Sequence, residues 1–166
     1  KNMNIKKTIL KELDKAYATT IMDINDQAHY LIATEGYGPC VTFNGLTGEE
    51  GKVWDGPGGT MNIVSIPGKK NQFIATQDFT PTFQAKESKI VHAKLDENGQ
   101  WIIKPIMIIP YLHRFDVFML HGKLFFIGAT LCEDKDSKDD WSKPGKVYIG
   151  EIPEELNGPF AIKPVL

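Results

Sequence analysis

Apolar and polar positions along the chain form one pattern that occurs three times. Each copy has two short apolar runs of β-strand length with a turn sequence between them, and each ends in an apolar segment closed by threonine. The copies cover Thr19–Thr34, Met61–Thr76 and Phe115–Thr130, have equal length and align without a gap. Turn-forming pairs occupy the middle of each copy: Asn25-Asp26, Pro67-Gly68 and His121-Gly122. Strand, tight turn and strand are typical of a β-hairpin, so the pattern predicts three hairpins.

A second pair of strands is expected after two of the hairpins. The expected strands and turns are Lys89–Ala93, Asp96–Gly99 and Trp101–Ile106 in the second copy, and Gly145–Gly150, Glu154–Gly158 and Phe160–Val165 in the third. The last strand carries Ile-Lys-Pro in both copies, and a proline cannot donate to a ladder, which predicts an edge strand. The first copy is shorter and keeps Lys52–Trp54 as a strand remnant.

The segment before the first copy is open to two interpretations. Ile5–Leu10 could form the outer strand of a preceding unit, and its position just upstream of the first hairpin favours this. The apolar spacing also fits an amphipathic helix, with apolar residues at Ile5, Ile9, Leu10, Leu13, Ala16 and Tyr17.

Four short strands in units of about 40 to 55 residues are typical of a β-propeller blade. We therefore predict an all-β chain, a β-propeller or partial propeller with about three four-stranded blades, in units of approximately 19–60, 61–114 and 115–166. A β-sandwich would not explain matched hairpins in each copy. Because propellers typically close with about four to eight blades, we expect either self-association or the remainder of a longer chain to complete the ring.

Composition excludes some classes of function. The net charge is −2 and gives no electrostatic footprint for nucleic acid or an anionic membrane. No apolar run approaches the length needed to span a bilayer, and no signal peptide is visible, so a cytoplasmic location is the default expectation. The first residue is Lys1, so an upstream segment could have been removed. Cys40 and Cys132 match no metal or redox spacing and are expected to be buried.

Candidate ligand-binding residues lie next to the repeated strands. The Ile-Ala-Thr segments are the expected innermost strands, and they are followed by Glu35 in the first copy and Gln77-Asp78 in the second. A second aligned polar position, Thr20, Asn62 and Asp116, opens each copy. Nearby loops are rich in glycine and proline, at residues 35–39, 54–59 and 78–81. Loops on a rigid scaffold often carry function, so we expect Glu35, Asn62 and Asp78 at the mouth of a central channel.

His113, Arg114 and Asp116 cluster at the start of the third hairpin. Such a cluster could bind an anionic or hydroxyl-rich ligand or supply a general base. Alternatively, His113 and Arg114 could bond loop carbonyls and pair with Asp116 for structural reasons, or His113 could bind a metal. The other histidines, His29, His92 and His121, show no local metal-binding spacing, and no metal site is predicted.

Other chemistry-bearing segments have a simpler interpretation. The acidic run Glu133–Asp140 does not fit a calcium-binding loop and is expected to be a solvated surface loop. Trp141 could stack on a sugar or seal that loop, whereas Trp54 and Trp101 are expected to pack in the interior. Two carboxylates on neighbouring blades, Glu35 and Asp78, could do acid–base work as in a glycosidase or lyase.

Three segments carry a family resemblance: Gly56–Val64, Phe83–Val91 and His113–Asp116. They resemble segments of uncharacterised bacterial β-propeller proteins of about twice this length. The chain is more distantly similar to the propeller part of aldos-2-ulose dehydratase, a metal-using sugar lyase. This resemblance implies carbohydrate chemistry. No metal ligand of that lyase can be matched to a residue of this chain, so the cofactor stays unknown. His113 is the one residue that the resemblance suggests as functional.

Two functional hypotheses result. The first is a propeller that binds a sugar or similar polar small molecule and acts on it as a lyase or isomerase, with His113 and Asp116 catalytic and Glu35, Asn62, Asp78 and Arg114 binding the ligand. The second is a non-catalytic interaction scaffold, whose partner surface would be formed by exposed aromatic residues: Tyr37, Phe79, Phe83 and Trp141.

Overall fold

The computed structural model describes residues 3–165, and the side chains of Thr82 and Phe83 are outside that description. Within this range the chain forms twelve β-strands, one 3₁₀ helix and no α-helix, which confirms the predicted all-β class. The elements are β1 (Ala16–Ile24), β2 (Gln27–Thr34), β3 (Cys40–Asn44), β4 (Glu50–Trp54), β5 (Ile63–Ser65), β6 (Gln72–Gln77), η1 (Thr82–Glu87), β7 (Lys89–Leu95), β8 (Trp101–Ile108), β9 (Leu112–Leu120), β10 (Lys123–Thr130), β11 (Val147–Ile152) and β12 (Lys163–Pro164).

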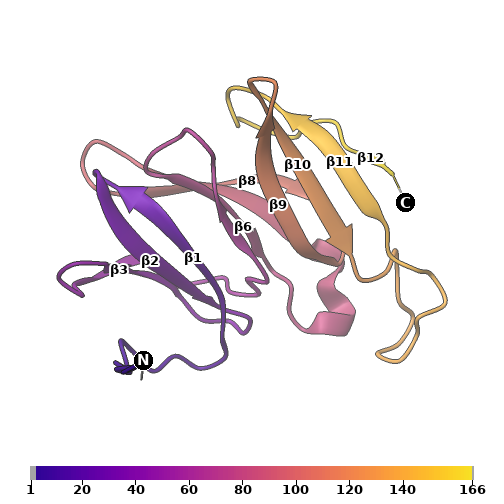
Figure 1. Cartoon of the computed structure of the whole chain (residues 1–166). Helices are drawn as coiled ribbons and strands as arrows, with labels where there is room; N and C mark the ends of the chain where they lie inside the picture. The colour runs from indigo at the N-terminus through magenta and orange to yellow at the C-terminus, as the bar shows by residue number, and fades with distance from the viewer. Residues whose placement is uncertain (1–2, 166) are drawn as a thin grey trace.

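The strands of residues 3–165 form three antiparallel four-stranded sheets, each made of consecutive strands. The first sheet has the order β1-β2-β3-β4, the second β5-β6-β7-β8 and the third β9-β10-β11-β12. Figure 1 shows the sheets arranged like a fan, from the indigo first sheet to the yellow end of the third. Three sheets of four strands confirm the predicted blade architecture.

The three predicted hairpins are present, formed by β1 with β2, β5 with β6, and β9 with β10. Residues in the turns adopt positive φ, which tight hairpin turns require: Asn25 at 50°, Asp26 at 63°, His121 at 51° and Gly122 at 77°. The predicted edge prolines, Pro105 and Pro164, lie in β8 and β12, the outermost strands of their sheets.

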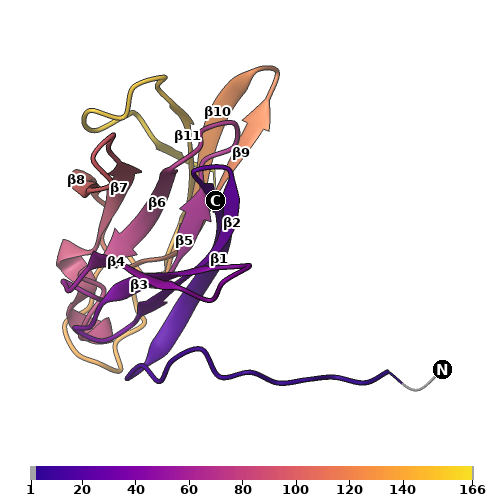
Figure 2. The same cartoon turned by 90° about the vertical axis from the view of Figure 1, so that its left-hand side faces the viewer.

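Two sequence-based predictions about strands were incomplete or wrong. The prediction missed β3, because Cys40–Phe43 are all buried and show no alternation of apolar and polar residues. Ile5–Leu10 forms neither the strand nor the helix that we considered. The side chain of Ile5 is 85% exposed, so this segment gains no burial that would stabilise either element. Figure 2 shows the segment leading away from the sheets.

The innermost strands also differ from the prediction. Contacts between neighbouring sheets run from β1 to β5 and from β5 to β9, so the first strand of each sheet is innermost. The strands that contain Ile-Ala-Thr, β2 and β6, and their counterpart β10 lie second. The Thr20 and Asp116 positions are therefore on inner strands, and the residues that follow the Ile-Ala-Thr strands lie in loops at one end of the sheets.

Two apolar layers hold the sheets together. Leu31, Trp54 and Phe73 belong to the layer between the first and second sheets. Ile74 and Phe126 belong to the layer between the second and third sheets. Burial of these side chains is the main favourable contribution to folding, about 1.5–3 kcal/mol for each large apolar side chain. The rigid stack fixes the positions of the loops at its ends.

The cysteines and tryptophans behave as predicted. Cys40 and Cys132 are buried free thiols, and burial raises the pKa of both. Trp54 is buried and Trp101 packs edge-on against Phe73. In the described part of the chain, no helix has the length and apolar character that a membrane crossing requires.

Candidate functional site

The loops that follow β2, β6 and β10 lie together at one end of the three sheets. The segment between β4 and β5 passes between the ends of β2 and β6 and bonds to both. Gly59 N–H donates to the Gly36 carbonyl at 2.7 Å, and Phe79 N–H donates to the Gly59 carbonyl at 3.2 Å. This approach needs glycine, because a Cβ on Gly58 would lie 1.8 Å from the Gly36 oxygen. The joint fixes Glu35 and Phe79 relative to each other.

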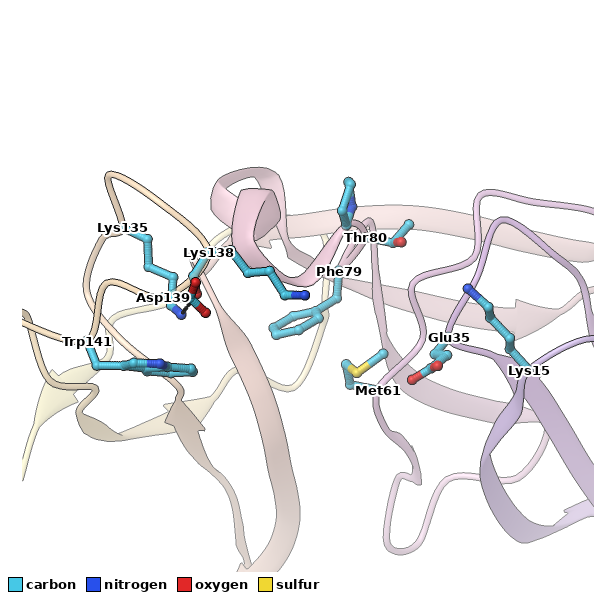
Figure 3. Close-up of a pocket in the computed structure, with 10 residues that line it drawn as sticks. Lys15, Glu35, Met61, Phe79, Thr80, Lys135, Lys138, Asp139 and Trp141 are labelled. Atoms are coloured by element: carbon cyan, nitrogen blue, oxygen red, sulfur yellow. Dashed lines mark hydrogen bonds between the residues drawn. The ribbon is translucent and has the colours of Figure 1, made fainter.

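A pocket of about 400 Å³ opens at this end of the molecule. It is lined by loop residues that lie before or after strands of all three sheets: Lys15, Glu35, Met61, Phe79, Thr80, Pro81, Lys135, Lys138, Asp139 and Trp141. Figure 3 shows Glu35 and Lys15 on one side of the pocket, Trp141 and Asp139 on the other, and Met61 and Phe79 between them. The volume lies within the range of about 300–1,000 Å³ that is typical of small-molecule sites.

The floor of the pocket belongs to a third apolar cluster. Met61 and Phe79 pack there with Ala85, Tyr111 and Cys132. Phe79 is 1% exposed, so the expectation of an exposed Phe79 in a partner surface was wrong. Tyr37 and Trp141 are exposed as expected, and the side chain of Phe83 lies outside the described residues. Because Phe79 and Met61 are 1% and 4% exposed, the exposed aromatic surface at the pocket is that of Trp141.

Charged side chains line the pocket on both sides of the apolar floor. Figure 3 shows the Glu35 carboxylate directed into the pocket and the Lys138 side chain extending across it above Phe79. Asp139 lies on the same loop as Lys138, and Lys15 lies on the side of Glu35. Carboxylates accept and ammonium groups donate hydrogen bonds, so this pocket can bind a ligand that carries both donors and acceptors.

Lys135 and Trp141 form the outer wall. The Lys135 ammonium lies 3.0 Å from the centre of the Trp141 ring and donates to the Lys138 carbonyl at 3.0 Å. Asp140 accepts from the Ser142 and Asp136 backbone N–H groups, and hydrogen bonds from Ser142 first of all lower its pKa to about 2. The run Glu133–Asp140 is therefore an ordered loop with a buried lysine, rather than only a solvated one.

A polar cluster lies beside the pocket at the start of the inner strands. Arg114 donates to the Tyr17 hydroxyl at 3.1 Å and to the Met61 carbonyl, and its guanidinium lies 5.1 Å from the centre of the Tyr17 ring. The Tyr17 hydroxyl is 3.5 Å from Nε2 of His113. The His113 ring lies 5.7 Å from that of Phe79, the floor residue, so His113 is adjacent to the pocket rather than part of its lining.

His113 is held in its neutral form by its surroundings. Burial first, and then the positive charge of Arg114, lower its pKa below the usual value, while Glu35 opposes this shift. A neutral imidazole at physiological pH can accept a proton, which is the property that a general base needs.

The other predicted site residues do not line the pocket. Asn62 donates to the Phe115 carbonyl and Asp78 pairs with Lys89 at 2.5 Å. Asp116 is exposed and accepts from the Val117 N–H at 2.8 Å. Of the residues predicted to bind or react, the structure therefore places Glu35 in the pocket and His113 and Arg114 beside it. The bond from Arg114 to a loop carbonyl matches the structural alternative in part.

Sequence reasoning missed several residues of the site. Tyr17 was considered only as part of a helix, and Lys15, Lys135 and Lys138 were not singled out. Tyr17 could have been found from the repeat, since it lies at the start of the first hairpin as His113 and Arg114 lie at the start of the third. The lysines carry no such signal, because lysine is common on every protein surface.

The remaining histidines are away from this end. His92 is buried in β7, and its Nε2 lies 3.0 Å from the Gln72 side-chain oxygen. His29 bonds the Gln27 carbonyl through Nδ1 at 2.9 Å. Within residues 3–165, no three side chains of His, Cys, Asp or Glu lie close enough together to hold a metal ion.

No protein-family model matches the chain, and no curated protein matches it in sequence. Solved structures do match. An α-L-arabinofuranosidase from Lactobacillus brevis is 15% identical with a TM-score of 0.59 over 89% of this chain. The hydrazine synthase of Kuenenia stuttgartiensis is 12% identical with a TM-score of 0.57 over 87%. A PQQ-bound aldose sugar dehydrogenase from Streptomyces coelicolor is 16% identical with a TM-score of 0.56 over 91%.

The chain has the fold of a partial β-propeller. It spans 51%, 41% and 48% of the three matched chains, about half of each. Two of the three act on sugars by their names and one does not, so the fold alone does not assign a function. The predicted similarity to aldos-2-ulose dehydratase stays a prediction.

Proposed function

We propose that this propeller chain binds a carbohydrate or a similar hydroxyl-rich small molecule in the pocket between Glu35 and Trp141. One observation carries the proposal: loops of all three sheets bring carboxylate, ammonium and aromatic groups together around an apolar floor. A sugar offers hydroxyl groups, which need both donors and acceptors, and C–H faces, which pack on apolar and aromatic surfaces.

Each group has a role in this proposal. Glu35 accepts hydrogen bonds from sugar hydroxyls, and Lys138 donates to hydroxyl or ring oxygens. Met61 and Phe79 form the apolar floor, and Trp141 closes the outer wall. Because the glycine joint fixes Glu35 and Phe79, binding would require little ordering of this side of the pocket.

The chemistry we propose is that of a lyase or isomerase, with His113 as the proton-transfer group. In a β-elimination, His113 would take the proton from the carbon next to a carbonyl, the C–H electron pair would form the double bond, and the β-hydroxyl would leave as water after taking up a proton. Lowering of the His113 pKa by burial and Arg114 supports this role. Asp116, which is exposed and lies two positions after Arg114, is the proposed second acid–base residue.

Binding is tested by tryptophan fluorescence, because Trp141 is 59% exposed at the pocket whereas Trp54 is buried. We expect a panel of neutral and acidic monosaccharides and disaccharides to contain ligands that change the emission in a saturable way. Glu35→Gln should weaken this binding, by about tenfold if one charge-assisted hydrogen bond is lost. Glu97→Gln, an exposed carboxylate in the turn between β7 and β8, is the matched control and should not weaken it. Equal effects of the two variants would count against the pocket.

Catalysis is tested separately in deuterium oxide. Proton abstraction next to a carbonyl would exchange that substrate proton for deuterium, which proton NMR measures directly. We expect exchange with the natural chain and little with His113→Gln, with sugar binding retained. Exchange that is unchanged in His113→Gln would exclude His113 as the base and leave the binding site in place.

A further inference from the structure

The pocket contains an excess of positive charge. Three ammonium groups, those of Lys15, Lys135 and Lys138, face two carboxylates, those of Glu35 and Asp139. Among the residues that the structure describes, none of these five groups forms an ion pair within 4.0 Å. Lys15, Lys138, Glu35 and Asp139 can therefore offer their charges to a ligand, whereas Lys135 is 6% exposed and lies over the Trp141 ring.

Three acidic residues near the pocket do not offset this excess, because each of them is paired with a lysine. Asp134 pairs with Lys86 at 2.6 Å and with Lys143 at 3.2 Å, and these partners lower its pKa to about 2. Asp78 pairs with Lys89 at 2.5 Å. Glu133 pairs with Lys146. Arg114 adds a further positive charge at the Met61 carbonyl, next to the floor.

The Lys138 ammonium group is placed to bind an anionic group of a ligand, and Lys135 holds the loop that carries it. Lys135 donates to the Lys138 carbonyl at 3.0 Å, is 6% exposed and is held over the Trp141 ring, so it anchors the loop that carries Lys138. The Lys138 side chain is exposed and extends across the pocket above Phe79 (Figure 3). Glu35 lies on the opposite side. A ligand that fills the pocket would therefore have its anionic group near Lys138 and its hydroxyl groups near Glu35.

We infer that the ligand is a sugar acid, a carbohydrate bearing one carboxylate that binds Lys138. This inference rests on the proposed carbohydrate site and names its ligand class. A carboxylate is favoured over a phosphate, because Glu35 and Asp139 in the same pocket repel a phosphate dianion more strongly than a carboxylate monoanion.

Isothermal titration with three related ligands tests the inference: glucuronate, glucose and glucose 6-phosphate. They share the pyranose ring and differ in the group at carbon 6. We expect glucuronate to bind about tenfold more tightly than glucose at low salt. The advantage should decrease as salt rises, because the pocket is open to solvent. Lys138→Gln should remove the advantage of glucuronate over glucose, because glutamine keeps a hydrogen-bond donor but lacks the positive charge. Lys163→Gln, an exposed lysine on β12 with the same change of charge, should preserve it.

The outcomes separate the two proposals. Equal affinity for glucuronate and glucose would overturn the sugar-acid inference and leave the proposed function standing. Tighter binding of glucose 6-phosphate than of glucuronate would overturn the choice of carboxylate. A glucuronate preference that survives Lys138→Gln would overturn the role of Lys138. No binding of any of the three would contradict the proposed function itself.

Discussion

Gly58→Ala is the sharpest structural test of how the pocket is built. The added Cβ would lie 1.8 Å from the Gly36 oxygen and 2.8 Å from the Gly38 nitrogen. Both atoms belong to the backbone and cannot rotate away, so the loop after β2 and the segment between β4 and β5 must separate. Separation breaks the bond from Gly59 N–H to the Gly36 carbonyl and strains that from Asp78 N–H to the Gly58 carbonyl, at 2.7 and 2.9 Å.

The magnitude follows from these two effects. Each backbone hydrogen bond contributes about 1 kcal/mol net, and overpacking costs about 1–3 kcal/mol. We therefore expect Gly58→Ala to lower the free energy of unfolding by about 3 kcal/mol, or Tm by roughly 6–12 °C for a domain of this size. Because the joint positions Glu35 and Phe79, sugar affinity should fall at temperatures where the variant is still folded.

Urea unfolding followed by circular dichroism measures the effect. Gly158→Ala is the control, since an added Cβ there meets nothing within 4 Å. It should be neutral or slightly stabilising, because alanine restricts the unfolded chain. If the two variants had equal stability, the close approach of the loops would not exist as described, and the explanation of how Glu35 is fixed would be wrong.

Three further predictions follow from buried groups, protonation and exposed apolar faces. Among the described residues, the buried Thr60 hydroxyl has no hydrogen-bond partner, so Thr60→Val should be neutral or raise the free energy of unfolding by about 1 kcal/mol in urea; a loss of more than that would show a hidden partner. The folded-state pKa of His113 is lowered from 6.5, so the unfolded chain binds the proton first as pH falls. The stability that His113 contributes is present above pH 6.5 and is lost as pH falls through the folded pKa, and His113→Gln should reduce the slope of unfolding free energy against pH in that window; an unchanged slope would contradict a buried, neutral imidazole. Apolar side chains on the two end sheets, among them Ile21 at 60% exposure and Leu120 at 49%, should drive self-association, which light scattering would detect and Leu120→Lys would weaken, whereas a strict monomer at all concentrations would count against it.

The sequence predicted the architecture better than the site, and the reason is physical. Hairpins are local, so the turn pair Asn25-Asp26 and its flanking strands could be read from a short stretch of sequence. β3 was missed because a strand buried on both faces shows no alternation. For Ile5–Leu10 a strand was favoured from its position before the first hairpin and a helix was considered from its apolar spacing, but a strand also needs a neighbour for its hydrogen bonds.

The pocket depends on contacts between distant segments, which local patterns do not record. Glu35 was predicted from its place after a repeated strand, and the structure puts it in the pocket. Asp78 occupies the corresponding place in the second copy, yet it pairs with Lys89 instead. The clustering of Tyr17 with His113 and Arg114 joins the first and third sheets, and its one trace in the sequence is that Tyr17 and His113 hold equivalent positions before their hairpins.

The most direct test of the binding site is an NMR map of amide and indole shifts in the isotope-labelled chain as glucuronate and glucose are added. We expect the largest shifts at Glu35, Thr80, Lys138 and the indole N–H of Trp141, which come from loops of all three sheets around one pocket. Shifts centred at the opposite end of the sheets, around His92 and Lys104, or no shifts at millimolar sugar, would contradict the assignment of this pocket as the carbohydrate site.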